Sequence, residues 1–339
     1  MKADIATHII ISPQCTLSGA LGVLDMLVTA NYLAQRTPGL STRFRPQLVA
    51  EGGAAIQGSC GLSLAPRSDL GDPAAVDIAI VASGPPAILG AVRMAEALAA
   101  QAGLARWLAD AHAAGAQLAS CCTGSFLLAA AGLLDGRLAT THWRAANTFR
   151  ALYPQVGLRI DSLLVEDERL LTGGGAQSFS TVVLHLVEQH MGAAVAGATA
   201  RLMLADGREA GQTAYQEWLP QREHGDSAIA RAQDWLEQHL DTPFDLERCA
   251  ASAHLTARTL LRRFKQATGL APLQYQQRLR VEAAKRLLET SAAAVNRIVW
   301  EVGYEDVSSF QRLFRRETGL TMAEYRQRFG GRRYAGTRA

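Results

Sequence analysis

The chain of 339 residues is long enough for two domains of ordinary size, and its 48% hydrophobic and 19% charged residues suit a soluble globular protein. Its five cysteines show neither a CxxC pattern nor the Cys/His spacing of a metal site. We see no apolar run near the ~18 residues of a membrane span, and no signal-peptide pattern at the start. We therefore expect a reduced, cytoplasmic protein with no membrane association, no metal and no cofactor.

The net charge of +3 conceals an asymmetry between the two ends of the chain. Residues 226–339 hold 19 Lys/Arg against 13 Asp/Glu, a net of +6, whereas residues 1–225 hold 15 against 18, a net of −3. A basic C-terminal third suggests a polyanionic partner for that part alone. An ordinary solvated helical surface explains the charge equally well.

Short β-rich runs alternate with Ala- and Leu-rich stretches in the first 200 residues. This alternation predicts an α/β domain with a mainly parallel sheet that helices cover on both faces. The expected strands are 7–12, 45–50, 77–84 and 116–121, and the expected helices are 19–34, 94–114 and 179–191.

From about residue 226 the pattern is helical throughout, which predicts a separate all-α domain. The polar segment before it is punctuated by Gly and Pro, as linkers are. The expected organisation is an N-terminal domain at 1–210, a linker at 211–225, a helical domain at 226–330 and a basic tail at 331–339.

An internal repeat lies in the helical part. "FKQATGLAPLQYQQR" begins at Phe264 and "FRRETGLTMAEYRQR" at Phe314, an offset of 50 residues. Both copies keep Phe, Thr-Gly-Leu, Tyr and Gln-Arg in register. A repeat of this kind indicates one supersecondary module present twice.

Each copy predicts a helix, a tight turn and a second helix. In the first copy His254 is expected in the left-handed turn, Thr256 at the N-cap of the second helix, and Gly269 at its end. In the second copy Gly303 takes the turn and Asp306 the N-cap.

The second helix of each copy is predicted to have one buried face and one solvent-exposed face. Leu260 and Phe264 in the first copy, like Phe310 and Phe314 in the second, are expected to face inward. Arg and Gln side chains on a wet face can bond guanine and adenine in a DNA major groove, and apolar tips can meet a thymine methyl. Two plain helical hairpins are the alternative, but two copies in register on the basic domain favour DNA reading. The expected DNA-contacting residues are Arg258, Leu261 and Arg262 in the first copy and Val307, Ser308, Gln311 and Arg312 in the second.

The stretch "EVGYEDVSSFQRLFRRETGLTMAEYR" closely resembles the end of the paired helix-turn-helix domain of AraC-type transcriptional regulators. The resemblance implies that each module places one recognition helix in successive major-groove segments of double-stranded operator DNA. The first turn departs from the usual Gly with His254.

The run "QLASCCTGS" (117–125) predicts a strand, a tight turn and a helix, with Cys122 on the turn. A helix N-terminus favours a thiolate and offers backbone N–H donors, so we expect a lowered pKa at Cys122. Gly124 is expected to let the turn pack closely, and Cys121 to lie in the core.

Residues 1–200 resemble the PfpI/ThiJ group of the class I glutamine-amidotransferase-like fold, and more closely the version fused to AraC-type domains in GlxA-like regulators. The stretches that carry the resemblance are "CTGSFLLAAAGLLDGRLATTHW", "ALGVLDMLVTAN" and "LLTGGGAQSFSTVVLHLVEQHMG". It implies a flavodoxin-like fold. Enzymatic members place a His after the nucleophile and a carboxylate near the first helix, whereas this chain has Thr123 and Gly19 there. A lone Cys lacks the partners that nucleophilic catalysis needs, so we expect no catalytic residue.

A fold of this class builds its pocket at the carboxyl ends of its strands. Trp143 could stack on a cationic ligand, although a core aromatic is an equal interpretation. The resemblance implies a small nitrogenous effector such as an amino acid or a quaternary amine. The expected effector-site residues are Ser18, Gly19, Gly84, Cys122, Thr123, His142 and Trp143.

The sequence therefore predicts a ligand-responsive, DNA-binding transcriptional regulator that is not an enzyme and forms a homodimer through its N-terminal domain. The alternative is a PfpI/ThiJ-like cysteine hydrolase or glyoxalase-type enzyme with an accessory DNA-binding domain.

Overall fold

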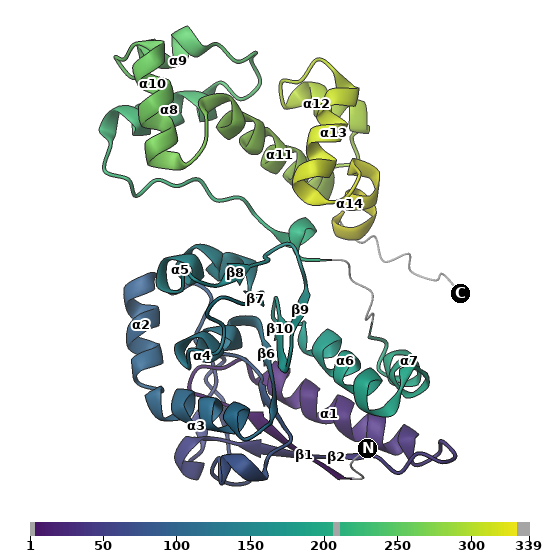
Figure 1. Cartoon of the computed structure of the whole chain (residues 1–339). Coiled ribbons are helices and arrows are strands. Elements are labelled where there is room, and N and C mark those ends of the chain that lie inside the picture. The colour runs from purple at the N-terminus through teal and green to yellow at the C-terminus, as the bar shows by residue number, and fades with distance from the viewer. Residues whose placement is uncertain (1–3, 206–210, 331–339) are drawn as a thin grey trace, which may run out of the picture. The chain divides into compact units, whose positions relative to one another are not determined.

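The computed structural model describes residues 4–205 and 211–330. Contacts divide the chain into two compact units, residues 1–212 and 213–339 (Figure 1). The expected basic tail at 331–339 lies outside the described residues.

The first unit is built on a six-stranded sheet of order β2-β1-β5-β6-β10-β9. Neighbouring strands are parallel except for β9, which runs antiparallel to β10. Two short pairs, β3–β4 and β7–β8, lie outside this sheet. The strands are β1 (Asp4–Ile10), β2 (Arg43–Val49), β3 (Ile56–Gln57), β4 (Ser63–Leu64), β5 (Ile78–Val81), β6 (Gln117–Cys121), β7 (Leu138–Ala139), β8 (Gly157–Leu158), β9 (Leu164–Asp167) and β10 (Leu170–Gly173).

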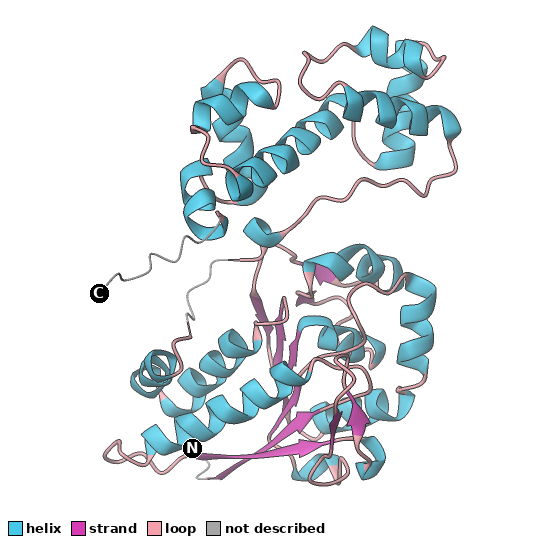
Figure 2. Cartoon of the chain, turned by 180° about the vertical axis from the view of Figure 1, so that it is seen from behind, coloured by secondary structure: helices cyan, strands magenta, loops and turns pink. Residues whose placement is uncertain are grey.

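Helices cover both faces of the sheet, and each face has its own apolar core (Figures 1 and 2). One face carries α1 (Leu17–Ala34), α6 (Phe179–Met191) and α7 (Ala193–Leu202). The other carries α2 (Ala91–Ala99), α3 (Ala102–Ala113), α4 (Ser125–Ala130) and α5 (Ala146–Leu152). The predicted α/β architecture is confirmed.

Two details of this unit differ from the prediction. The single helix expected at 94–114 is two helices, because the backbone leaves helical geometry at Gln101 (φ −113°, ψ 24°). The antiparallel hairpin β9–β10 was not predicted. Its turn has Glu168 at φ 56° in place of the Gly or Asn that marks such turns in a sequence.

Helix α1 corrects a further expectation, since it is long and apolar enough, by length and composition alone, to cross a membrane. In the structure it lies against β2, α6 and α7. Ala20, Val23 and Leu27 are fully buried there. Its apolar character is that of a core helix covering a sheet.

The second unit is all-helical and contains two modules, each with its own core. The 19-residue helix α11 runs from the first module into the second (Figure 1). The predicted helix-turn-helix modules correspond to α9–α10 and α12–α13. The helices are α8 (Ser227–Gln238), α9 (Leu246–Ser252), α10 (Ala257–Thr268), α11 (Pro272–Thr290), α12 (Val295–Glu301), α13 (Val307–Thr318) and α14 (Met322–Phe329).

The two copies of the sequence repeat pack their aromatic residues in the same way. Phe264 meets Tyr275 at 5.3 Å between ring centroids and 86° between planes, and Phe314 meets Tyr325 at 5.4 Å and 88°. Each tyrosine hydroxyl also bonds a glutamate of an earlier helix, at 3.3 Å to α8 and 2.8 Å to α11. Burial is the largest cause that raises the pKa of both tyrosines, which stay neutral donors.

The two turns show why the modules differ at one position. His254 and Gly303 both have positive φ, 56° and 77°. A Cβ at position 303 would lie 2.5 Å from the backbone of Asp241, so only glycine fits there. The His254 side chain is exposed, and His tolerates the left-handed region better than most residues. The departure at His254 therefore leaves the predicted turn intact.

The predicted helix ends are also confirmed. Thr256 accepts the N–H of Thr259, and Asp306 accepts two backbone N–H groups at the start of α13. Gly269 ends α10 in the left-handed conformation (φ 76°).

Asp226 ties the first recognition helix to the start of α8. Its carboxylate caps α8 by accepting the N–H groups of Ala228 and Ile229, and Arg263 of α10 donates to both oxygens at 2.6 and 3.0 Å. Burial alone would raise the pKa of this carboxyl, but the bonds from Arg263 and the backbone outweigh it and lower the pKa.

We expect Asp226→Ala to reduce the free energy of unfolding of the second unit by about 1–3 kcal/mol at neutral pH, because it removes a cap and a charged pair. Since the folded pKa is lowered, this contribution is present above the ordinary carboxyl pKa and is lost as pH falls through the folded value. Urea denaturation at about pH 7 and about pH 3 measures it. Asp245→Ala is the matched control, because Asp245 caps α9 in the same way. Equal losses for both variants at neutral pH would show that the Arg263 pair contributes nothing.

Candidate functional site

The end of β6 turns sharply at Cys122. This residue has φ 56° and starts a short 3-10 turn, Cys122–Gly124, which leads into α4. We call this turn the elbow. The Cys122 side chain is 7% exposed, whereas Cys121 is fully buried in the core as predicted. The predicted strand, turn and helix are present.

Close backbone approaches assemble the loops around this turn. A Cβ at Gly124 would lie 2.8 Å from the carbonyl oxygen at the end of β5, which confirms the expected tight packing. A Cβ at Gly84 would lie 2.4 Å from the Thr123 carbonyl oxygen. At Gly19 it would lie 3.3 Å from the Ala82 carbonyl oxygen. The structure therefore brings Gly19, Gly84 and Thr123 together with the elbow.

Thr141 connects the elbow to the predicted aromatic segment. Its hydroxyl donates to the Cys122 carbonyl at 3.3 Å and accepts from the Ser125 hydroxyl at 2.8 Å. The next residues, His142 and Trp143, are half-buried, with their ring centroids 5.6 Å apart. Both follow directly on this connection to the elbow.

Ser18, at the start of α1, is exposed while its neighbour Gly19 is buried against β5. Successive helical residues point about 100° apart, because a turn holds 3.6 residues. Ser18 therefore directs its side chain away from the strand that Gly19 faces.

The expected lowering of the Cys122 pKa is wrong. Burial raises the pKa of this thiol, and hydrogen bonds with the backbone and hydroxyl of Thr123 offset only part of the effect. Burial, followed by the charge of Arg144, lowers the pKa of His142, whose Nδ1 accepts the Arg144 N–H at 3.1 Å. At neutral pH the elbow therefore holds a protonated thiol and a neutral imidazole.

Several polar residues near this edge of the sheet escaped the sequence analysis. Ser12 follows β1, is 3% exposed, and has a hydroxyl without a hydrogen-bond partner among the described residues. Thr141 and Ser125 hold the elbow, as described above. Ser12 ends the predicted strand "THIIIS", so its place at the end of that strand could have been predicted from the sequence. Gln212, which donates to the Thr141 carbonyl, could not have been predicted as a site residue, because it belongs to the expected linker.

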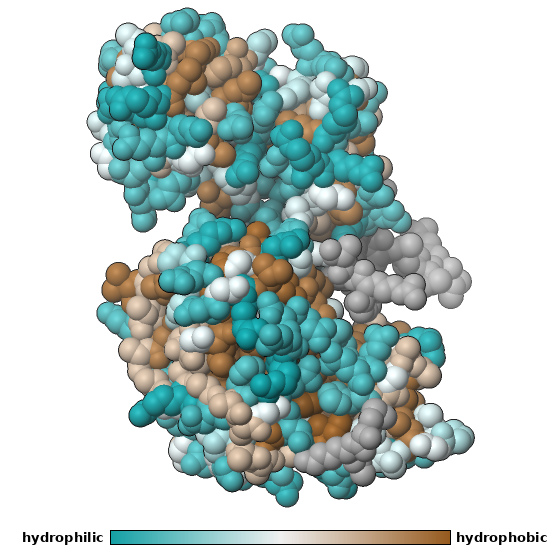
Figure 3. Space-filling view, in the orientation of Figure 1, coloured by the Kyte–Doolittle hydropathy of each residue, from teal (hydrophilic) through white to brown (hydrophobic). Residues whose placement is uncertain are grey.

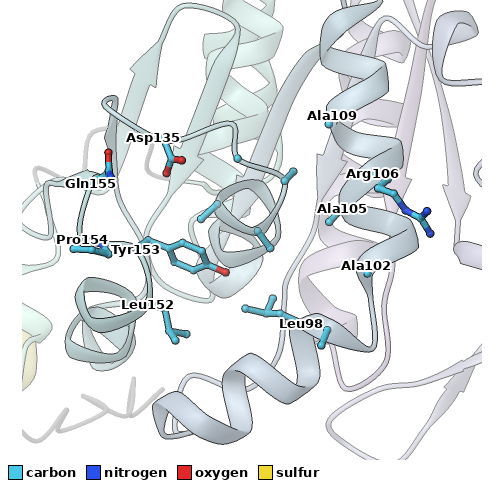
Figure 4. Close-up of a pocket in the computed structure, with 15 residues that line it drawn as sticks. Leu98, Ala102, Ala105, Arg106, Ala109, Asp135, Leu152, Tyr153, Pro154 and Gln155 are labelled. Carbon is cyan, nitrogen blue, oxygen red and sulfur yellow. The ribbon is translucent and has the colours of Figure 1, made fainter.

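A separate cavity of about 760 Å³ lies among α2, α3, α4 and α5. Figure 4 shows Tyr153 and Leu98 pointing toward one another within it, while Arg106 points outward. Seven of its fifteen lining residues are alanines, and none of the predicted effector-site residues lines it. In the described part of the chain, no group of three or more His, Cys, Asp or Glu residues could hold a metal ion.

The predicted DNA-contacting residues lie on α10 and α13. Arg258, Leu261 and Arg262 are exposed on α10, and Leu261 keeps 42% of its surface in solvent although it is apolar. On the same helix Leu260 and Phe264 are fully buried, as predicted. The surface of this unit visible in Figure 3 is mostly hydrophilic.

Of the predicted residues on α13, Ser308, Gln311 and Arg312 are exposed, whereas Val307 is half-buried against the core of its module. Arg312 donates to the Ser309 hydroxyl at 2.9 Å. That hydroxyl in turn donates to the capping carboxylate at the helix start, at 2.8 Å. The guanidinium group is thereby held near the N-terminal end of the recognition helix.

Comparison with known proteins matches both units. The model of the DJ-1/PfpI family matches residues 23–189, and that of a helix-turn-helix domain matches residues 249–328. The transcriptional regulator CdhR of Pseudomonas aeruginosa is 29% identical over 62% of this chain and 63% of its own length. The regulator GbdR of the same species is 24% identical over 92% of this chain and 81% of its own length.

A crystal structure of a protein from Vibrio parahaemolyticus is similar to the first unit in fold. It is 22% identical, covers 59% of this chain and 99% of its own, and has a TM-score of 0.50.

These matches and the two paired recognition helices define the class: the protein is a DNA-binding transcriptional regulator. More particularly, the chain resembles AraC-type regulators in which a helix-turn-helix domain follows a DJ-1/PfpI family domain.

Because burial keeps its thiol protonated, Cys122 should react with iodoacetamide at least about tenfold more slowly than an exposed cysteine. Cys60, which is exposed, is the control within the same chain. Mass spectrometry of peptides after timed alkylation at neutral pH gives both rates. Labelling in denaturant shows that both peptides are detected. Faster labelling of Cys122 than of Cys60 would mean an activated thiolate at the elbow.

Proposed function

We propose that this protein controls transcription by binding double-stranded operator DNA with both helix-turn-helix modules, in response to a small molecule at the elbow of the first unit. The observation that carries the proposal is the equivalence of the two modules. Each holds its recognition helix by the same Phe–Tyr contact and exposes an arginine at the matching outer position.

The two recognition helices offer different chemistry to the major groove. On α10 two arginines flank the exposed Leu261, a combination suited to guanine beside a thymine methyl. On α13 Gln311 adds an adenine-type contact next to Arg312. Because the two helices carry different side chains, we expect an operator whose two half-sites have different base sequences.

Arg262→Ala and Arg312→Ala should each cost about 1–3 kcal/mol of DNA-binding free energy, because each removes one arginine contact to a base. They should relax base preference at separate positions about one helical turn apart. Fluorescence anisotropy with duplexes changed one base pair at a time measures both effects.

Arg286→Ala is the matched control for lost charge, since Arg286 is exposed on α11, outside both recognition helices. It should weaken binding slightly and uniformly across sequences. If Arg312→Ala behaves like the Arg286 control, the second module does not read bases.

We propose that the effector binds beside Gly19, Gly84, Cys122, Thr123 and the His142–Trp143 segment, at the carboxyl ends of the strands. The half-buried Trp143 ring and neutral His142 suit an amino acid or a quaternary amine, since a cation over an indole face gains about 0.5–2 kcal/mol. Calorimetry of the full chain against amino acids and betaines tests the assignment, with Trp143→Leu expected to weaken binding.

The elbow supports sensing and not catalysis. In the described part of the chain, the hydrogen bonds at the Cys122 peptide and thiol lead to Thr123, Ser125 and Thr141, none of which is a base at neutral pH. Such a site needs no cofactor, and we infer that the regulator works in the cytoplasm, where its DNA lies. Turnover of a glyoxalase, deglycase or amidase substrate that is lost in Cys122→Ser would favour the enzyme alternative.

We also propose that the first unit forms a homodimer through α1 and α7. Leu21, Val28 and Tyr32 are exposed along one side of α1, between 41% and 52%. The end of α7 adjoins them, where the Thr29 hydroxyl lies 3.6 Å from the Met203 sulfur. A contiguous apolar patch of this kind on a soluble domain marks an interaction surface.

Val28→Asp should shift the full chain from dimer toward monomer in sedimentation equilibrium, because it buries a charge in the proposed interface. Val92→Asp, on the exposed side of α2 at 73% exposure, is the control and should leave the dimer unchanged. A monomeric wild-type chain, or a dimer insensitive to Val28→Asp, would rule out this interface.

A further inference from the structure

The side chain of Gln212 is buried in the first unit, 2% exposed, although the sequence places this residue in the linker. Its Nε2 lies 3.1 Å from the Thr140 hydroxyl, 2.9 Å from the Thr141 carbonyl and 3.2 Å from the Ser162 carbonyl. Its Oε1 accepts the backbone N–H of Trp143 at 3.1 Å. We call these four partners the carboxamide socket.

The socket has a definite chemical preference. Three acceptors surround one end of the bound group, and a single N–H donor faces the other end. A primary carboxamide matches both ends, because its NH₂ offers two N–H donors to the three acceptors and its carbonyl accepts from the N–H donor. A carboxylate would bring lone pairs against the acceptors, and an ammonium group would leave the N–H donor without an acceptor; each leaves a buried polar group unpaired.

The neighbouring backbone is shaped around this side chain. The Gln212 N–H donates to the Asp161 carbonyl at 3.3 Å. A Cβ at Gly174 would lie only 2.0 Å from the Gln212 Nε2. The Gly174 N–H itself donates to the Leu163 carbonyl at 2.8 Å. The glycine-rich run 172–175 therefore leaves room for a neutral amide.

The chain after Gln212 is held by the second unit. Tyr215 packs its ring against Phe329, with centroids 5.1 Å apart, and accepts a hydrogen bond from Arg328 at 2.6 Å. Only residues 213 and 214 separate Gln212 from Tyr215 along the chain. The position of Gln212 therefore sets how much free chain connects the two units.

We propose that the socket is a binding site for primary carboxamides and that Gln212 is its resident ligand. While Gln212 occupies the socket, it holds the start of the segment that joins the two units, and we call this hold the latch. Trp143 belongs both to the socket and to the proposed effector site, and Thr141 connects the socket to the Cys122 carbonyl of that site. An effector that moves them releases Gln212 and lengthens the tether. This last step rests on the proposed function, whereas the socket and its ligand class do not.

The test uses the full chain and follows hydrogen exchange of the Trp143 amide, which Gln212 protects. Gln212→Ala should speed this exchange about five- to tenfold, the factor expected for one lost hydrogen bond. Acetamide, which has the heavy atoms that Gln212→Ala removes, should restore protection at high concentration. Acetate, which is the same size but a carboxylate, should not. Gln177→Ala, at an exposed glutamine after the same glycine run, is the matched control and should change nothing.

Gly174→Ala provides a second, independent variant. Its new methyl group takes the place of the Gln212 amide end, so it should expose the Trp143 amide as much as Gln212→Ala does. Acetamide should fail to restore protection, because the socket is filled. The double variant should exchange no faster than either single one, since both remove the same interaction.

The proposal is overturned if the Trp143 amide exchanges at the wild-type rate in Gln212→Ala, or if acetate protects as well as acetamide. These readouts involve no DNA, so they stand or fall separately from the proposed function. The latch step has its own readout: both single variants should change operator affinity by the same factor. Unchanged affinity in both, with the socket results as expected, would retain the site and remove the latch.

Discussion

Each recognition helix depends on one buried phenylalanine that meets a tyrosine edge to face. Phe264 and Phe314 are completely buried, and near-perpendicular rings at this distance are the arrangement that aromatic pairs prefer. The tyrosine comes from the helix that follows, and its hydroxyl bonds a glutamate of an earlier helix. The aromatic contact and the hydrogen bond of the tyrosine together join three helices. The helical period then determines which side chains of the recognition helix face solvent. The exposure of Arg262 and Arg312 follows from the burial of their neighbours.

In the first unit, burial dominates the chemistry of the elbow. A helix N-terminus contributes about 0.3–1 kcal/mol, which is less than one pKa unit, and α4 has only six residues. Full burial can shift a pKa by up to ~3–5 units in the opposite direction for a thiol. The pKa of Cys122 is accordingly raised. The sharp turn at Cys122 brings loops together at the carboxyl ends of the strands, where α/β folds bind ligands.

Features written in local residue patterns were predictable, and those created by distant contacts were not. The 50-residue repeat, the caps at Thr256 and Asp306 and the inward-facing Phe264 and Phe314 follow from short-range periodicity and capping rules. The break at Gln101 and the hairpin turn at Glu168 carry none of the usual Gly, Pro or Asn signals. Gln212 was misread because polar residues beside glycine resemble a linker, while its partners lie at least 50 residues away in sequence.

The predicted lowering of the Cys122 pKa failed because it was judged from residues adjacent in sequence, whereas burial against other elements decides the pKa. The same kind of long-range contact accounts for the apolar length of α1, which the sequence analysis underestimated. The thiol loses its solvent to loops from β5 and from the segment around Thr141. The apolar side chains of α1 find their partners on β2, α6 and α7.

The central claim is that both modules of this chain read DNA through the major groove. Its most direct test is a dimethyl sulfate protection footprint of the full chain on duplexes selected from a random library, because this reagent methylates guanine N7 in the major groove. The account predicts two protected major-groove segments about one helical turn apart, each with its own selected bases. Protection of a single segment, or selection that yields no preferred sequence, would contradict it.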